Sequence, residues 1–228
     1  MQVIFEDNHI IAVNKAVSEI VQGDKTGDES LDITIKKYLK KKYNKPGNVF
    51  LGVAHRIDRP VSGVVLFAKT SKALTRLNKL FHNNGVKKTY HAIVAKPPPA
   101  IEGQLIHYLV RNTKQNKSYC YDRELPQSKR AVLHYKVLKK SERYWMLEID
   151  LKTGRHHQIR AQLAAMGCPI KGDLKYGYPR SNHYPGICLH AHSISFIHPV
   201  TNEKISLEAK PPEKEKLWKI FYNAPAVR

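Results

Sequence analysis

The chain has 228 residues, of which 39 are lysine or arginine and 19 are aspartate or glutamate, so its formal net charge is +20. This length can bury a substantial core, and we expect one domain over residues 1–228. This excess of positive charge favours a protein that binds nucleic acid over a basic protein without such a partner. Lysine and arginine side chains that neutralise phosphates release counterions, which favours binding.

The three cysteines, Cys120, Cys168 and Cys188, are odd in number and have no paired CxxC spacing. They therefore indicate neither a disulfide framework nor a cysteine-rich zinc site, and they fit a reducing compartment. The N-terminus lacks a basic segment followed by a long apolar one, and no apolar run approaches membrane-spanning length. We expect a cytoplasmic protein without a membrane partner.

The first half of the chain predicts a hairpin and two helices. Residues 3–5 and 10–13 read as strands joined by a polar turn. Ser30 is placed to cap an amphipathic helix that ends near residues 44–47. Residues 64–68 form an apolar strand, and Ser71 is expected to cap a second helix with Leu74, Leu77, Leu80 and Phe81 on its apolar face.

The second half predicts mostly strands. Tripeptide 97–99 is all proline and forms a connector, whereas Gly154 and Gly167 are expected to open and close a helix. The expected strands are residues 90–94, 131–138, 144–151, 187–190, 193–197 and 205–208, and residues 217–221 form a short helix. Strands outnumber helices without βαβ regularity, which predicts an α+β fold with a mixed, mainly antiparallel central sheet flanked by helices and loops, and a cleft across it.

One carboxylate stands out in the run from His55 to Lys69. Asp58 lies between Arg56 and Arg59, in a loop that enters the apolar strand 64–68. Nearby positive charge favours the ionised carboxylate, and the buried strand gives it a rigid support. This arrangement suits a nucleophile or base that faces an anionic substrate.

Several other polar residues can be interpreted either as structural or as functional. Arg155, His157 and Arg160 are expected in the first helical turns after Gly154, where backbone N–H groups favour anions, although exposed arginines and capping histidines are equally common. Tyr90 lies in a strand, where packing is the usual role; beside a catalytic carboxylate it could stack on a base and transfer a proton.

His190 and His192 share one face of a predicted strand, a spacing that can bind metal. No third ligand, HExxH motif or cysteine cluster accompanies them, so we expect structural histidines and no metal. Glycine-rich phosphate loops are absent from the sequence, which argues against a nucleotide cofactor.

Taken together and in order, several segments resemble the RluA-type pseudouridine synthases, enzymes that isomerise uridine in structured RNA. The segments are residues 6–15, 55–63, 88–94, 153–160, 169–177, 189–192 and 196–199. The resemblance implies that Asp58 is the essential catalytic carboxylate, that Arg160 pairs with it, and that no external cofactor is needed. It also implies that Tyr90 stacks on the uracil and can remove its carbon-5 proton, and that Arg56 fills the space left by the extruded target nucleotide.

Two features depart from the family pattern. Relatives commonly continue the early Asn-Lys with proline and a glycine-containing turn, whereas here Lys15 is followed by Ala16-Val17-Ser18-Glu19. Many relatives also carry an N-terminal S4-like RNA-binding domain, for which we expect no room before the first strand. The lysines of residues 36–45, together with Lys87 and Lys88, are then expected to contact RNA.

The sequence thus predicts a monomeric RNA pseudouridine synthase that acts on specific uridines of ribosomal or transfer RNA. Asp58 could act covalently, electrostatically or as a base, and the sequence does not choose among these roles. One alternative is a catalytically silent RNA-binding or ribosome-assembly module on the same fold. Another is a metal-dependent hydrolase that uses His190 and His192.

Overall fold

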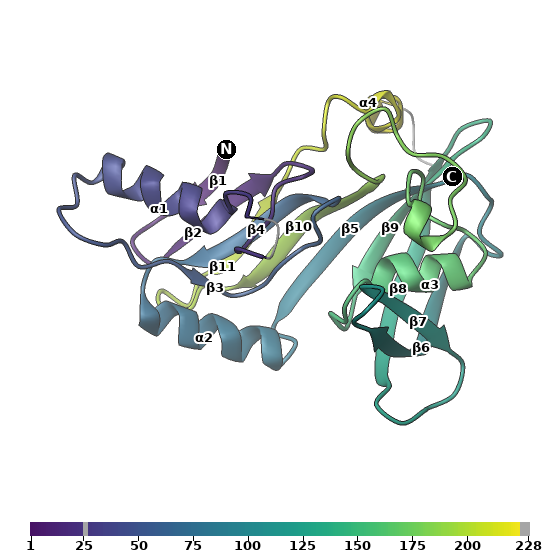
Figure 1. Ribbon diagram of the computed structural model, residues 1–228, viewed down its shortest axis with the longest axis horizontal. Coiled ribbons are helices and arrows are strands. Elements are labelled where there is room, and N and C mark those ends of the chain that lie inside the picture. The colour runs from purple at the N-terminus through teal and green to yellow at the C-terminus, as the bar shows by residue number, and fades with distance from the viewer. Residues whose placement is uncertain (25–26, 224–228) are drawn as a thin grey trace. The chain divides into compact units, whose positions relative to one another are not determined.

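The computed structural model describes residues 1–24 and 27–223, and its strands and helices fall into two units (Figure 1). The first unit comprises Met1–Val86 and Ala191–Pro211, and the second comprises Lys87–His190 and the residues from Pro212 onward. The expected α+β class with a mainly antiparallel sheet is confirmed. One domain over residues 1–228 stays a prediction. Within the described ranges, no helix is long and apolar enough to span a membrane.

In the first unit, the strands lie in the order β1-β2-β4-β10, with β3 beside β4 and β11 beside β10. The expected hairpin is confirmed, since β1 and β2 pair antiparallel, as do β2 and β4. The elements of this unit are β1 (Gln2–Glu6), β2 (Ile10–Lys15), α1 (Leu31–Lys42), β3 (Gly52–Val53), β4 (Ser62–Ala68), α2 (Ser71–His82), β10 (Leu189–Ile197, whose first two residues belong to the second unit) and β11 (Lys204–Glu208).

One part of the core of the first unit lies between this sheet and helix α2. Alternate residues of β2 and β4 point to one face of the sheet and meet Ala73 and Leu77 of α2. Figure 1 shows α2 along one side of these strands and α1 along the other. All of β4 is buried, so this strand gives the loop before it a rigid support.

The start of α2 differs by one residue from the sequence prediction. Thr70, rather than Ser71, is the N-cap, and its side chain accepts a hydrogen bond from the Ala73 backbone N–H. Thr70 has the extended backbone of a cap, whereas Ser71 is already helical. Either hydroxyl residue fits the sequence pattern, and the backbone conformation decides between them.

Gly63, at the start of β4, is required by a close approach of two backbones. Its φ is +122°, and a Cβ there would lie 2.2 Å from the carbonyl oxygen of Ala191 in β10. Only glycine avoids both the unfavourable dihedral and the overlap. Gly63 therefore fixes how closely β4 and β10 approach beside the Asp58 loop.

In the second unit, the strands lie in the order β5-β9-β8-β6-β7. The predicted pairing of the two strands around the 139–143 turn is confirmed, because β8 and β9 are antiparallel neighbours. Helix α3 packs on this sheet through Ala161, which meets Leu109 of β6 and Ala131 of β8. The elements are β5 (Val86–Val94, whose first residue belongs to the first unit), β6 (Glu102–Asn112), β7 (Lys117–Tyr121), β8 (Lys129–Lys140), β9 (Trp145–Leu151), α3 (Gln158–Ala165), the 3-10 turn η1 (Leu174–Tyr176) and α4 (Lys216–Asn223).

Two predictions about strands need correction. The hairpin of β6 and β7 was not predicted at all, because its apolar residues are mixed with charged ones and most of β6 is only partly buried. Residues 187–190 and 193–197 were expected as separate strands, whereas β10 runs without a break from Leu189 to Ile197. The predicted strand at 205–208 and terminal helix at 217–221 are confirmed as β11 and α4.

Helix α3 is shorter than predicted. It begins at Gln158 rather than Gly154, because His157 has a left-handed backbone conformation with φ 53° and ends the preceding turn. The predicted end is confirmed: Gly167 has φ +84°, its N–H bonds to the Ala164 carbonyl, and the Cys168 N–H bonds to the Leu163 carbonyl. Arg155 and His157 therefore precede the helix and do not lie in its first turns.

Replacing Gly63 by alanine tests the close approach of β4 and β10. Because the added methyl group meets backbone at an unfavourable φ, Gly63→Ala should lower the free energy of unfolding by about 3 kcal/mol. The matched control is Gly47→Ala, since nothing lies within 4 Å of a Cβ there. Urea unfolding measures both variants, and equal stabilities would contradict the required contact.

Candidate active site

Asp58 lies in an irregular loop between β3 and β4, as predicted. Ile57 is buried and Asp58 is half-buried, so consecutive residues turn one side chain into the core and the next toward the loop surface. The Val61 N–H donates to the Asp58 carbonyl at 3.0 Å and closes a turn directly before β4. The carboxylate is thus held on a short segment anchored at both sides.

His55 fixes the beginning of this loop. Its Nε2 accepts a hydrogen bond from the Leu66 N–H of β4 at 2.9 Å, and its ring stacks on Phe81 of α2 with 4.8 Å between centroids. Because Nε2 accepts from a backbone N–H, the ring is neutral at this nitrogen. His55 therefore ties the loop to both the strand and the helix of the core.

Lys15, at the end of β2, fixes the other side of the loop. Its side chain is fully buried, and its Nζ donates to the carbonyl oxygens of Ala16 (2.8 Å), Glu19 (2.8 Å) and Arg59 (3.2 Å). Burial lowers the pKa of Lys15 to about 8, although the charges of Glu19 and Asp58 act in the opposite direction. One ammonium group thus connects the 16–19 loop, which departs from the family pattern, to the loop that carries Asp58.

The two arginines near Asp58 in the sequence both lie at the surface. Arg59 is exposed, and its Nη2 pairs with Asp28 Oδ2 at 2.6 Å. Its backbone carbonyl accepts from the Ser18 N–H as well as from Lys15. Arg56 is also exposed. The side chain of Arg59 is therefore engaged in a surface ion pair, and its backbone is what supports the loop.

The second unit carries Tyr90 and Arg160. Tyr90 is half-buried in β5, opposite Ile149 of β9. Arg160 is almost fully buried in α3. Since Asp58 belongs to the first unit, its pairing with Arg160 and its proximity to Tyr90 stay predictions.

Asp173 holds the guanidinium of Arg160 in a bidentate pair. Arg160 Nε donates to Asp173 Oδ2 at 2.7 Å and Nη2 donates to Oδ1 at 2.8 Å, while the Cζ of Arg160 lies 5.1 Å from the centroid of the Tyr176 ring. Both residues of the pair are buried, so the guanidinium plane is fixed. A further bond from Nη1 to His157 Nε2 supports the same orientation.

His157 completes this buried cluster. Its Nε2 accepts from Arg160 Nη1 at 3.1 Å, so its Nδ1 carries the proton and donates to the Tyr176 hydroxyl at 3.0 Å. Burial and the positive charge of Arg160 lower the pKa of His157 to about 2. The imidazole is therefore a neutral acceptor that orients Arg160.

The predicted anion site at the start of α3 is wrong in its geometry. The Arg155 N–H already donates to Gln158 Oε1 at 2.9 Å, and Arg155 Nε donates to the Arg130 carbonyl at 3.1 Å. Gln158 itself also accepts from Thr153, so this segment is a tied loop before the helix. Arg160 is the one basic residue of the three that lies within α3.

The two histidines considered as metal ligands lie in β10. His190 is buried, and its ring centroid lies 6.0 Å from that of Trp218. Over residues 1–24 and 27–223, the structure contains no group of three or more histidine, cysteine, aspartate or glutamate side chains placed to hold a metal ion.

Sequence reasoning gave no role to Asp173, His55 or Tyr176. Asp173 and Tyr176 lie in the segment 169–177 that contributed to the family resemblance, and His55 begins the Asp58 segment. A buried aspartate near a buried arginine is a usable signal, but burial itself is not visible in one sequence. Their roles follow from hydrogen bonds to residues of other elements.

Several known proteins are similar in sequence to this chain. Residues 9–165 match the family described as RNA pseudouridylate synthase. Ribosomal large subunit pseudouridine synthase C of Rickettsia prowazekii is 34% identical over 211 residues, which cover 92% of this chain and 67% of that protein. The tRNA pseudouridine synthase C of Vibrio vulnificus is 29% identical over 243 residues, which cover 97% of this chain and 94% of that protein.

The fold is also found among solved structures. Human RNA pseudouridylate synthase domain containing 4 has a TM-score of 0.81 and 21% sequence identity, with 98% of this chain and 94% of that chain covered. At this identity the likeness concerns the fold.

Replacing Lys15 by methionine tests its role as an anchor. Three backbone carbonyls lose the Lys15 donor, so Lys15→Met should lower the free energy of unfolding by about 2–3 kcal/mol and speed hydrogen exchange at the Ser18 and Val61 amides. Lys41→Met, at an exposed position of α1, is the control and should change stability by less than about 0.5 kcal/mol. Unchanged exchange at both amides would show that Lys15 does not hold the loops.

The lowered pKa of His157 predicts a pH dependence of stability. Between pH 6.5 and about 2 the unfolded chain binds a proton at His157 that the folded chain does not, so stability falls as the pH falls below 6.5. In His157→Gln the free energy of unfolding should therefore fall less steeply with falling pH than in the wild type, by up to about 1.4 kcal/mol per pH unit. Urea unfolding between pH 7 and pH 4 measures it, and parallel profiles for the two proteins would contradict the neutral buried imidazole.

Proposed function

The chain belongs to the RNA pseudouridylate synthase family, and from this premise we propose that it isomerises specific uridines of structured ribosomal or transfer RNA with Asp58 as its essential carboxylate. The reaction breaks the bond between nitrogen and ribose, rotates the uracil and joins its carbon 5 to the same ribose. The relatives with curated names include enzymes of the ribosomal large subunit and of tRNA, which supports both RNA classes as substrates.

The observation that carries this proposal is the rigid placement of Asp58. Lys15 and His55 anchor its loop on both sides, and Asp58 itself is half-buried. Breaking the glycosidic bond leaves positive character on the ribose, so a fixed carboxylate can attack it, stabilise it or remove a sugar proton. All three roles need the same preorganised carboxylate beside the sugar.

Arg160 is proposed as the partner that orients Asp58. Asp173 and His157 hold Arg160 through its Nε, Nη1 and Nη2 atoms, which fixes the plane of the guanidinium. A carboxylate paired with this guanidinium would be held in a defined orientation and kept ionised by the arginine charge. His157 and Asp173 then act as positioning residues for Arg160.

Tyr90 and Arg56 are proposed to act on the target nucleotide. The half-buried ring of Tyr90 offers a face for stacking on uracil and a phenol that can take the carbon-5 proton. The target must leave the base stack before the glycosidic bond is accessible, and the long exposed side chain of Arg56 can fill the vacated space. No cofactor enters this scheme, because the uracil remains in the same nucleotide throughout.

The charge of +20 supports an RNA substrate, since lysine and arginine side chains can neutralise its phosphates. The three cysteines are free thiols, and burial raises the pKa of each of them, which suits a reducing cytoplasm as the site of action. The protein is proposed to act as a monomer.

Mapping pseudouridine in total RNA from cells with and without the gene tests the proposal. We expect one or a few sites in ribosomal or transfer RNA to disappear without the gene and to return with the wild-type protein. Asp58→Ala should not restore them, with a rate lowered by about three orders of magnitude or more in vitro, while RNA affinity stays within a few fold. Asp122→Ala is the control, because the Asp122 side chain is 99% exposed.

Full activity of Asp58→Ala would refute the assigned carboxylate. An unchanged pseudouridine map in cells that lack the gene, together with tight RNA binding by the purified protein, would favour a catalytically silent RNA-binding module instead. The two results differ because the first concerns one residue and the second concerns the activity of the whole protein.

A further inference from the structure

We propose that a groove between helix α2 and the segment after β10 binds the sugar-phosphate backbone of the substrate RNA, away from the target nucleotide. This inference rests on the proposed function for the identity of its ligand. The groove belongs entirely to the first unit and encloses about 410 Å³. Its lining comes from one turn-and-a-half of α2 and from residues 197–202, and it includes no residue of the Asp58 loop.

The charge of the groove is uniformly positive. Arg76 and Lys79 of α2 line it, both are exposed, and no acidic residue is among the residues that line it. Helix α2 as a whole contains no aspartate or glutamate, and Lys72 lies one turn before Arg76 on the same side. Lysine and arginine side chains three or four residues apart on a helix present a row of cations, which suits the successive phosphates of one strand.

The basic residues of α1 are in a different electrostatic situation. Lys36 pairs with Asp32 at 3.3 Å, Lys37 pairs with Glu29, and Lys42 pairs with Glu6 at 2.7 Å. Half of the lysines between residues 36 and 45 therefore already have a carboxylate partner. The lysines of α1 are thus partly compensated by carboxylates, whereas α2 contains no carboxylate of its own.

The groove also offers groups that suit ribose. Asn83 and Asn202 line it and can exchange hydrogen bonds with sugar hydroxyls. Leu80, Val200 and Ile197 add an apolar surface, and Ile197 is 46% exposed, an unusual position for isoleucine. A nucleotide can thus place its sugar on the apolar wall and its phosphate near Arg76 and Lys79.

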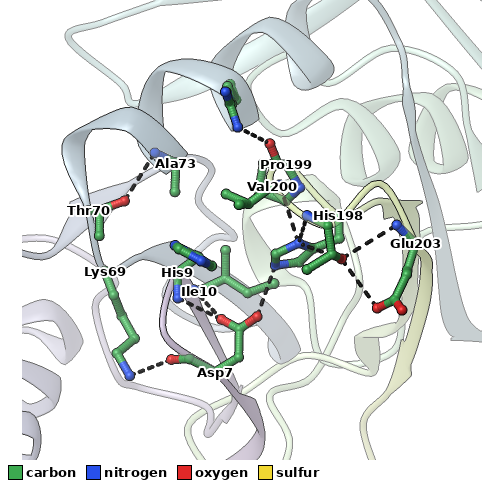
Figure 2. Close-up of polar contacts among 12 residues, drawn as sticks. Asp7, His9, Ile10, Lys69, Thr70, Ala73, His198, Pro199, Val200 and Glu203 are labelled. Carbon is green, nitrogen blue, oxygen red and sulfur yellow. Dashed lines mark hydrogen bonds and ion pairs between the residues drawn. The ribbon is translucent and has the colours of Figure 1, made fainter.

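The wall formed by residues 197–202 is rigid, because His198 organises it. Figure 2 shows His198 between Asp7 and the turn that leads to Glu203. Its Nδ1 accepts from the Thr201 N–H at 2.9 Å, so the proton lies on Nε2, which is 3.0 Å from Asp7 Oδ2. The Asp7 Oδ1 in turn accepts from the backbone N–H groups of His9 and Ile10.

Arg76 connects this wall to the helix. Its Nη1 donates to the Pro199 carbonyl at 2.8 Å, a bond drawn in Figure 2 at Pro199. The contact holds the guanidinium at the edge of the groove and uses one of its five N–H groups, so the others can reach a phosphate oxygen. The site is therefore assembled before RNA arrives, and binding costs little ordering of the wall.

Charge removal tests this groove. Arg76→Gln/Lys79→Gln should weaken binding of a labelled single-stranded oligouridylate about tenfold at 100 mM salt and lower the slope of log affinity against log salt by between about 1.4 and 2. Arg76→Lys/Lys79→Arg keeps both charges and should bind within about twofold of the wild type.

The matched control is Lys136→Gln/Lys219→Gln, which removes the same net charge. Both lysines are exposed, and Lys136 of β8 lies opposite Glu102 and Glu148 in the sheet, in an acidic neighbourhood. An equal loss of RNA affinity in the control would show that only net charge matters and would overturn the proposal that RNA binds in this groove. Wild-type RNA affinity of Arg76→Gln/Lys79→Gln, with an unchanged thermal unfolding curve, would overturn it as well and would favour a protein partner for the groove.

The proposed function can fail separately. If the wild-type protein forms no pseudouridine in any RNA, the enzymatic assignment fails, whereas the binding measurements still report on the groove. If pseudouridine forms normally but the groove variants bind like the wild type, the groove proposal alone fails.

Discussion

The buried ammonium group of Lys15 is the interaction on which the candidate site depends most. Burying a charged group is costly unless it is well bonded, and here three backbone carbonyls from two loops share one cation. Those loops have nothing else in common in the sequence. Because the Arg59 carbonyl is one of the three acceptors, the position of Asp58 one residue earlier follows from the position of Lys15.

The second unit uses the same physical device with different residues. Arg160 is buried, and Asp173 balances its charge. His157, which burial keeps neutral, accepts a further hydrogen bond from the guanidinium. In both units a buried cation is fixed by acceptors that the protein supplies. Such cations are held in place before substrate binds, and so are the segments that they connect.

The positively charged side chains of the protein differ in whether a nearby carboxylate compensates their charge. The lysines of α1 are partly compensated by nearby carboxylates, and Arg59 is held by Asp28. The side of α2 that carries Arg76 and Lys79 is not compensated in this way within its groove. Net charge therefore indicates the class of partner, whereas the pairing of individual charges indicates where on the surface that partner is bound.

The sequence by itself determined the α+β class, most strands and helices, and the placement of Asp58 in a loop before a buried strand, because these follow from local periodicity, caps and breakers. It also determined the family, through motifs in a fixed order. Only the tertiary structure decided that Lys15 holds the Asp58 loop, that Asp173 and His157 fix Arg160, and that α3 begins at Gln158. These depend on hydrogen bonds between different loops and elements of the folded chain and on one left-handed residue, His157, and neither leaves a periodic signal in the sequence.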